Sequence, residues 1–394
     1  MIRLSSLLVA LFIPGAALAQ PAPRIVFDTE LPATGGPTPN HHALGLPVAI
    51  GADGVHYVLQ HQYVPGSDTE AKAASVDLLA VAPNGTVMFR RALPPLQAKM
   101  AWDGLPMNSL SVTVAGPGDV AVFAASRERD GAPTPKASFA TLLRLGADGK
   151  VKNTATLGAP RAVANADFQH ATYNLRVMVP TSDNGLLLGG GFGTFFHAWW
   201  IAKVSLDGTR IWLADGGKGH TGQVSAIGPR PNGNWMTLVS DGGHHDSRTW
   251  DVRLRAANGK LLARHRAPTL PAFHAAVLRQ GAVLVESYNH EEPSKRLELI
   301  FIDDAGKVRR RVQWAFPLTH GLIADGDGFA GIVGDSTDVE SRRFVFRADA
   351  QGTVKWRTES NANIIVRSPD GHIVALVKSG NEEKRRRLVK FADP

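Results

Sequence analysis

The sequence contains no cysteine. Disulfides and thiolate metal ligands are therefore excluded, and the folded chain depends on its hydrophobic core for stability. A chain of 394 residues is long enough to bury such a core without covalent cross-links. The absence of cysteine also excludes a lipid-modified cysteine at a mature N-terminus.

Long apolar runs are also missing, and we expect no membrane span because a spanning helix needs about 18 or more such residues. The short apolar run at residues 7–13 follows Arg3 and precedes Ala17-Leu18-Ala19. This order of a positive charge, an apolar segment and small residues is typical of a secretory signal peptide. We predict a signal peptide at residues 1–19, export to the periplasm or the medium, and a monomeric mature chain of residues 20–394.

Several catalytic motifs are absent as well. The sequence has no G-x-S-x-G nucleophile motif, no H-E-x-x-H zinc motif and no D-x-D-x-D-G calcium loop. The glycine-rich segment at residues 189–193 follows a predicted strand and opens no helix, so it lacks the context of a phosphate-binding loop. The sequence therefore leaves open whether the chain is an enzyme.

Two hairpin patterns alternate along the chain, each with a short turn that is usually Asx-Gly between two alternating apolar runs. The first pattern occurs at residues 77–89, 141–151, 200–212, 251–262, 297–308 and 343–356. The second occurs at residues 47–59, 111–123, 177–189, 225–239, 275–286, 321–333 and 364–376. One hairpin of each kind makes a four-stranded antiparallel unit, and units of this size are typical of β-propeller blades. We predict an all-β, seven-bladed propeller.

The last unit lacks its outer strand at the C-terminus. Residues 24–30 have the composition of that strand, and Phe27 stands where Phe89, Trp212 and Trp356 stand in other copies. We predict that residues 24–30 complete the blade formed by residues 363–394, because such closure removes an open sheet edge.

These units resemble the repeats of exported bacterial β-propellers of the pyrroloquinoline-quinone-like repeat superfamily, in which an Asp-Gly turn precedes a Trp-bearing strand. The Trp position is Asn153, Ala263 and Arg310 in three units. In the dehydrogenases of that family, quinone binding typically involves a vicinal cysteine pair. Because this chain has no cysteine, the resemblance argues against pyrroloquinoline quinone as a cofactor.

The formal net charge is +8. Many basic residues fall on predicted outermost strands, namely Arg90, Arg91, residues 309–311, Lys355 and Arg357. Basic side chains on edge strands block edge-to-edge pairing, which is the interpretation we favour. The alternative is an acidic partner, such as a uronate glycan or an anionic envelope surface. Nucleic acid is not expected as a partner of an exported chain.

The second and third strands of each blade are joined by long loops, as are consecutive blades. Most of the 14 histidines fall in these two sets of loops, which share one face of a propeller. Loops of this kind usually carry function on a rigid scaffold. We therefore predict a ligand-binding face that includes His42, Asn108, Asn174, His274, His320 and Asn363.

Three functions are compatible with that face. The first is non-catalytic binding of a ligand, an acidic glycan or an envelope protein. The second is a polysaccharide lyase acting on uronate glycans, with His170 or His220 as base, Tyr173 as acid and Arg176 as carboxylate clamp. The third is a copper or zinc protein, with metal held by axial histidines or by His244, His245 and Asp246. The identity of the ligand and the metal content are left open.

Overall fold

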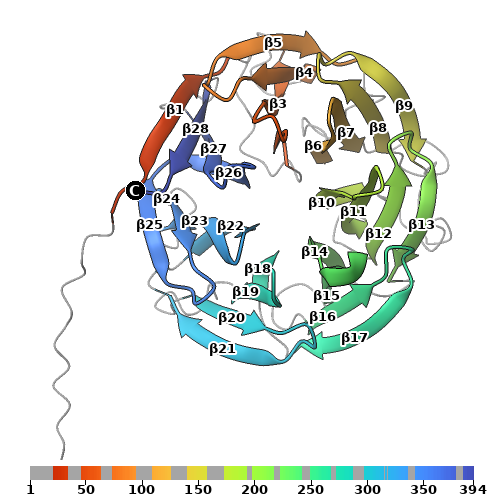
Figure 1. The fold of residues 1–394 in the computed structure, drawn as a ribbon, viewed down its shortest axis with the longest axis vertical. Coiled ribbons are helices and arrows are strands. Elements are labelled where there is room, and N and C mark those ends of the chain that lie inside the picture. Colours follow the sequence, from red (N-terminus) through yellow and green to blue (C-terminus); the bar gives the residue numbers. More distant parts are fainter. Residues whose placement is uncertain are drawn as a thin grey trace, which may run out of the picture.

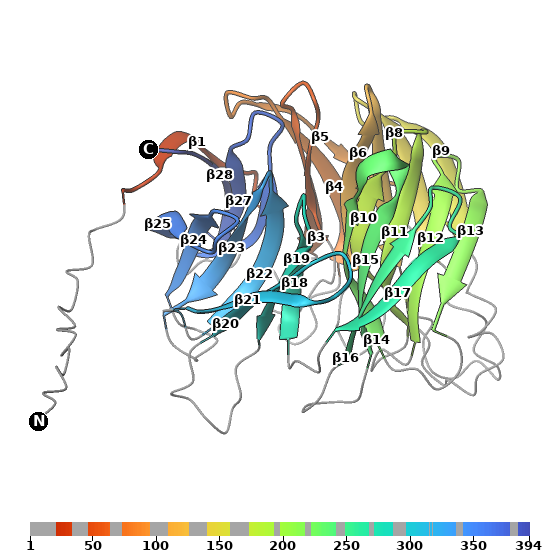
Figure 2. The same ribbon diagram turned by 60° about the horizontal axis from the view of Figure 1, so that its bottom comes forward.

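The computed structural model describes residues 21–33, 46–63, 73–94, 109–125, 140–157, 173–192, 198–216, 222–241, 249–267, 272–286, 297–314, 316, 318–335, 342–378 and 385–394. These residues form seven separate four-stranded sheets. The sheets stand side by side around one axis and close a ring (Figures 1 and 2). The predicted all-β, seven-bladed propeller is confirmed.

Each of the first six blades is an antiparallel meander whose first strand lies nearest the axis. Blade 1 contains β2 (Val48–Ile50), β3 (His56–Tyr63), β4 (Ala73–Val81) and β5 (Val87–Ala92). Blade 2 contains β6 (Ser109–Gly116), β7 (Asp119–Ala125), β8 (Ala140–Gly146) and β9 (Val151–Leu157). Blade 3 contains β10 (Tyr173–Pro180), β11 (Gly185–Phe192), β12 (Ala198–Ser205) and β13 (Arg210–Asp215).

The next three blades repeat the same order. Blade 4 contains β14 (Gly222–Pro229), the 3₁₀ turn η1 (Pro231–Gly233), β15 (Trp235–Asp241), β16 (Thr249–Arg255) and β17 (Leu261–Ala267). Blade 5 contains β18 (Ala272–Val277), β19 (Ala282–Glu286), β20 (Glu298–Ile302) and β21 (Val308–Gln313). Blade 6 contains β22 (Leu318–Asp325), β23 (Gly328–Gly334), β24 (Arg343–Ala348) and β25 (Val354–Glu359).

Blade 7 is assembled from both ends of the described chain. It contains β26 (Ala362–Arg367), β27 (Ile373–Lys378), β28 (Arg386–Ala392) and, as its outer strand, β1 (Arg24–Glu30). β1 runs antiparallel to β28, with Ile25 opposite Phe391 and Thr29 opposite Leu388. The predicted closure of the last blade by the N-terminal strand is confirmed. The predicted signal peptide lies outside the described residues and stays a prediction.

The hydrophobic core lies between blades rather than inside any one of them. For example, one buried cluster joins Phe123 and Leu142 of blade 2 to Leu188 and Trp200 of blade 3. Seven such clusters occur among the described residues, one at each contact between neighbouring blades. Because both faces of each sheet are covered, β23, the second strand of blade 6, is buried along its whole length.

The outer strands also anchor neighbouring blades. The Nε1 of Trp212 in blade 3 donates to the carbonyl of Ala257 in blade 4 at 3.4 Å. The Cβ that an alanine would carry at Gly259 would lie 2.5 Å from the Trp212 ring, so the turn has room only for glycine. Phe27 packs in the same way against Gly85, across the contact between blades 7 and 1. At these two contacts, and at Gly149 beside Phe89, the turn glycine receives an aromatic ring from the preceding blade.

The basic residues of the predicted outermost strands lie on β5, β21 and β25, which are outermost in their sheets as expected. Two of them form equivalent ion pairs across the outer two strands of their blades. Arg90 pairs with Asp77 at 2.5 Å, and Arg311 pairs with Glu298 at 2.5 Å. Arg264 and Asp251 make the same pair in blade 4 at 2.7 Å. These side chains therefore contribute to blade stability as well as covering an edge.

Candidate functional site

The innermost strands of five consecutive blades share a β-bulge at one position. The bulge leaves one residue unpaired in each of β10, β14, β18, β22 and β26. The unpaired residues are Arg176, Ser225, Phe273, His320 and Asn363. We refer to these five residues as the bulge ring. β-bulges redirect a side chain and are enriched beside functional sites.

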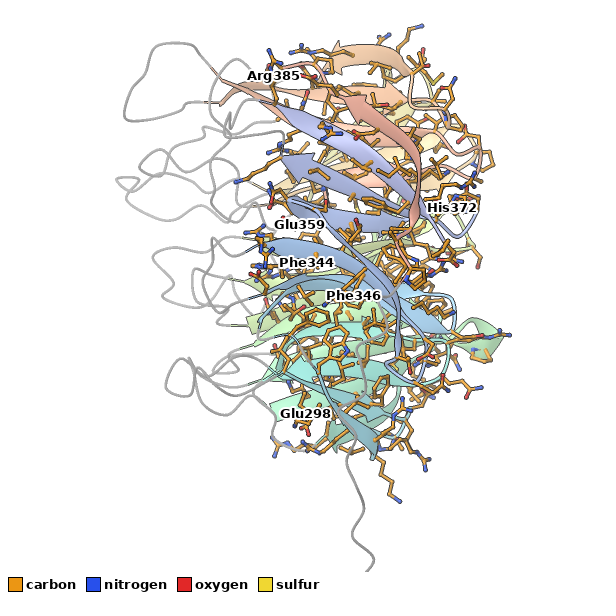
Figure 3. The ribbon with its side chains drawn as sticks, turned by 90° about the vertical axis from the view of Figure 1, so that its left-hand side faces the viewer. Glu298, Phe344, Phe346, Glu359, His372 and Arg385 are labelled. Atoms are coloured by element: carbon orange, nitrogen blue, oxygen red, sulfur yellow. The ribbon has the colours of Figure 1, made fainter. Side chains whose placement is uncertain are left out.

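The bulge ring lies towards one edge of the propeller. Its residues stand near the beginning of the inner strands, whereas the inner hairpin turns lie at the far end. Figure 3 places Glu298, Glu359 and Arg385 at the first edge and His372, next to such a turn, at the opposite edge. Arg343 is the first residue of β24, and the next residue, Phe344, pairs with Glu359. Arg343 therefore lies at the same edge as Glu359. The bulge ring is therefore on the side of the predicted ligand-binding face.

Arg176 connects two blades across the bulge ring. Its Nε donates to Oε1 of Gln223 at 3.0 Å, and Gln223 is buried at the start of β14. This contact fixes the guanidinium of blade 3 against blade 4. A guanidinium has five N–H donors, and a planar fork of this kind can bind a carboxylate through two of them.

His320, Arg343 and Asn363 form a second polar group in blades 6 and 7. The Arg343 guanidinium donates to Oδ1 of Asn363. Burial lowers the pKa of His320 to about 4, and the nearby charge of Arg343 adds to this effect. The imidazole is therefore neutral near pH 7. Its Nε2 is buried and has no hydrogen-bond partner among the described residues. A buried polar atom in this state calls for a partner such as a water molecule or a ligand.

Carboxylates are distributed unevenly along the inner strands. Within the described inner strands the one acidic residue is Asp325, at the end opposite the bulge ring. Two guanidiniums, those of Arg347 and Arg367, bind it there. At the bulge-ring end the innermost strands therefore contribute Arg176 and neutral polar groups, and Arg343 of β24 adds a second cation. The carboxylates of Glu298 and Glu359 at this edge belong to the outer half of their blades, on β20 and β25. Near the axis this arrangement favours an anionic ligand.

The sequence-predicted site residues divide into two groups. Arg176, His320 and Asn363 belong to the bulge ring, Tyr173 and Asn174 begin the same strand as Arg176, and His274 directly follows Phe273. The structure brings Asn363 to Arg343 and places His320 near the same arginine. The others lie outside the described residues, namely His42, Asn108, His170, His220, His244, His245 and Asp246.

Sequence reasoning missed Gln223 and Arg343, which hold two of the bulge-ring residues. Gln223 lies directly before a predicted inner strand and shows no local motif. Arg343 is on the third strand of its blade, where we expected no site residue. Their roles follow from contacts between blades, and no spacing along the chain encodes those contacts.

Within the described ranges, no group of three or more His, Asp or Glu side chains is close enough to hold a metal ion. His244, His245 and Asp246 lie outside these ranges, so the metal-binding alternative stays a prediction for them. In the same ranges no helix is long and apolar enough to cross a bilayer.

Comparison with known proteins supports the fold and does not identify a function. No protein-family model matches the sequence, and no curated protein matches it. A chain of a mitotic checkpoint complex is similar in structure, with a TM-score of 0.53 at 11% identity, covering 100% of this chain and 99% of that one. The Pan2 WD40 domain of Neurospora crassa gives 0.52 at 11% identity, covering 95% and 98%.

The propeller domain of the Trilobed protease from Pyrococcus furiosus is also similar, with a TM-score of 0.51 at 9% identity, covering 87% of this chain and 93% of that one. That domain is described as having an open velcro topology, whereas β1 closes the last blade here. At these identities the likenesses show a β-propeller fold alone.

Proposed function

We propose that this chain is an exported, non-catalytic propeller that binds an anionic ligand, a uronate-bearing glycan, at the bulge ring. The observation that carries the proposal is the clustering of Arg343, Asn363 and the unpaired Nε2 of His320 at one edge of the inner strands. A guanidinium suits a carboxylate, while neutral imidazole and amide groups suit sugar hydroxyls.

The distribution of charge supports the same proposal. Arg176 and Arg343 lie at the bulge-ring end, and Asp325 is kept at the other end. An anionic chain would therefore meet cations without facing a carboxylate of the described inner strands. A uronate polymer fits better than an isolated anion because Arg176 and Arg343 belong to blades 3 and 6, so a single small anion cannot satisfy both.

The test is binding of oligogalacturonate, measured by calorimetry against a neutral oligosaccharide of equal length. We expect saturable binding of the uronate oligomer alone, weakening as salt is added. Arg343→Gln is expected to lower its affinity at least tenfold. Arg279→Gln is the matched control, because Arg279 is exposed and lies at an inner turn of blade 5. Equal binding of the neutral oligomer, or an unchanged affinity in Arg343→Gln, would contradict the proposal.

Export is proposed on the sequence pattern of residues 1–19. N-terminal sequencing of protein recovered from the periplasm or medium is expected to begin at Gln20. Recovery only from the cytoplasm, with residues 1–19 intact, would refute export. Membership of the pyrroloquinoline-quinone-like repeat superfamily also stays a proposal from the repeat pattern.

A further inference from the structure

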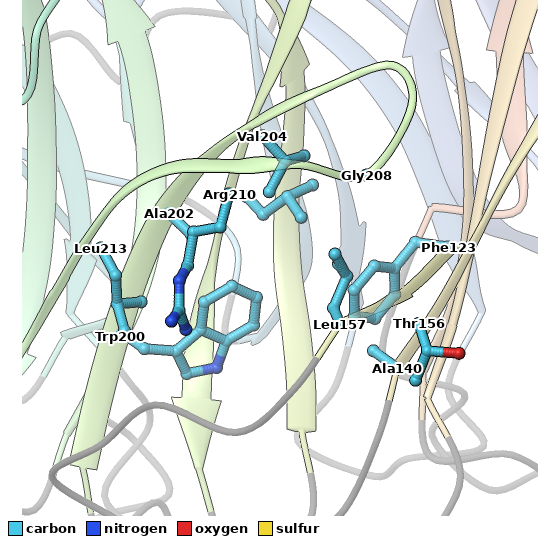
Figure 4. A pocket seen from close by; sticks show the side chains of 11 residues that line it. Phe123, Ala140, Thr156, Leu157, Trp200, Ala202, Val204, Gly208, Arg210 and Leu213 are labelled. Carbon is cyan, nitrogen blue, oxygen red and sulfur yellow. The ribbon is translucent and has the colours of Figure 1, made fainter. Parts of the chain in front are cut away.

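A cavity of about 280 Å³ lies between blades 2 and 3, away from the inner strands that carry the bulge ring. Figure 4 shows Trp200, Leu213 and Arg210 on one wall and Phe123, Ala140 and Leu157 on the other. The walls come from the second to fourth strands of the two blades. The cavity therefore lies between blades, at the rim of the ring rather than at its axis.

At this contact between blades, a small polar residue stands where some other blades carry a large outer-strand ring. At the equivalent position blades 3 and 6 carry Trp212 and Trp356, whereas blade 2 carries Asn153. The Asn153 amide donates to the carbonyl of Asp207 at 3.0 Å and so keeps the inter-blade hydrogen bond. Ala155 then occupies the place over Gly208 where an aromatic ring packs elsewhere. Blade 2 therefore keeps the hydrogen bond to blade 3 but has no large ring at this position.

The side chains that line the cavity are mainly apolar, with Thr156 and Arg210 as polar exceptions. Trp200 is buried and its Nε1 already donates to the carbonyl of Gly191 at 2.9 Å, so the indole offers a ring and no free donor. Thr156 and Arg210 are exposed and come from the outer strands β9 and β13, which border the mouth. Among the described residues Arg210 has no ion pair or hydrogen bond, and its side chain lies beside Trp200 (Figure 4).

We propose that this cavity, which we call the rim pocket, binds a small aromatic carboxylate. An apolar cavity of about 150 Å³ is enough for benzene, so the rim pocket has room for a ring with a short side chain. Phe123 and Trp200 face one another across it, and aromatic rings pack well against aromatic ligands. The Arg210 guanidinium at the mouth can take the carboxylate through two N–H donors. Apolar lining with a few polar groups at one end is the usual composition of small-molecule sites.

The experiment uses phenylacetate and indole-3-acetate as probes of the full chain, followed by calorimetry. Both are expected to bind saturably, and the uncharged 2-phenylethanol at least tenfold more weakly. Benzylamine, which has the opposite charge, is expected not to bind. Failure of both carboxylates to bind, or tighter binding of benzylamine, would overturn the proposal. Hexanoate binding as tightly as phenylacetate would overturn the preference for a ring.

Two variants test the rim pocket, one at its mouth and one in its interior. Arg210→Gln is expected to reduce phenylacetate affinity at least tenfold and to leave 2-phenylethanol affinity unchanged. Ala202→Leu fills the interior and is expected to abolish binding of both. Arg343→Gln, at the bulge ring, is expected to leave phenylacetate binding unchanged, so failure of the glycan proposal and failure of this one are distinguishable. An unchanged phenylacetate affinity in Arg210→Gln would refute the assignment.

Discussion

The indole Nε1 of Trp356 donates a 2.7 Å hydrogen bond to the carboxylate of Asp393. Trp356 is fully buried on the outer strand of blade 6, and Asp393 directly follows β28 of blade 7. Arg347 of blade 6 binds the same carboxylate at 2.7 Å. These contacts hold Asp393 against blade 6. Burial raises the pKa of the Asp393 carboxyl, but the hydrogen bonds from Trp356 and Arg347 and the charge of Arg347 together outweigh burial, so the pKa lies below its usual value.

We therefore expect Asp393→Ala to destabilise the fold. The variant leaves the Trp356 N–H without its acceptor, and an unsatisfied buried donor costs about 1–3 kcal/mol. The free energy of unfolding in urea measures the loss. Asp327→Ala is the control, because Asp327 and its partner Arg279 are both exposed, and an exposed ion pair contributes little to stability. Equal stability of the two variants would show that the contact to Asp393 is not needed.

Closure of the ring by β1 predicts a strong effect of Phe27→Ala. Phe27 is buried, packs edge-on against His56 of blade 1 with ring centroids 5.2 Å apart, and contacts Gly85. Removing a buried ring of this size costs about 3–5 kcal/mol. Ile25→Ala on the same strand is the control, because Ile25 is 57% exposed. Thermal unfolding of both variants checks the prediction, and a similar midpoint for the two would count against closure.

Gly259 provides a test of the contact between blades 3 and 4. It has a φ of +86°, and an added Cβ would lie 2.5 Å from the Trp212 ring. Gly233 has a φ of +71° but nothing within 4 Å of an added Cβ. Alanine is strained at a positive φ, so both variants carry that cost. Only Gly259→Ala also pushes its new Cβ into the Trp212 ring. We expect it to be less stable than Gly233→Ala by about 1–3 kcal/mol, as measured by chemical denaturation.

The burial of His320 predicts a pH dependence of stability. Its folded-state pKa of about 4 lies below the ordinary value of 6.5. As the pH falls, the unfolded chain therefore takes up the His320 proton before the folded chain does. The free energy of unfolding is highest above pH 6.5 and decreases towards pH 4.

We expect His320→Gln to flatten this part of the pH profile of unfolding midpoints. His265→Gln, on the outer strand β17, controls for the removal of an imidazole elsewhere. If wild type and His320→Gln lose stability equally between pH 6.5 and pH 4, the shift assigned to His320 is wrong.

The repeat pattern was sufficient to predict the architecture. A turn glycine between two runs of alternating apolar and polar residues predicts a hairpin. Gly54, Gly149 and Gly371 all adopt positive φ in the expected turns. The same local logic identified residues 24–30 as an outer strand, since Phe27 takes the position of Trp212 and Trp356. Blade number and ring closure follow from counting such units.

The site could be predicted only in part. Proximity to the start of an inner strand was enough to select Arg176, His320 and Asn363. The bulges that make them unpaired depend on hydrogen bonding between strands, and the partners Gln223 and Arg343 come from other strands. The rim pocket was not foreseen, because Asn153 was visible only as a departure from the repeat.

By itself, the sequence determined which segments form strands, how many blades they build and which strand closes the ring, because turn glycines and alternating apolar runs act over a few residues. Only the tertiary structure decided which side chains of different blades meet, such as Arg343 with Asn363, and where packing between blades leaves a cavity beside Trp200. The physical reason is that contacts between blades depend on the shapes of two surfaces that are brought together only when the ring has closed.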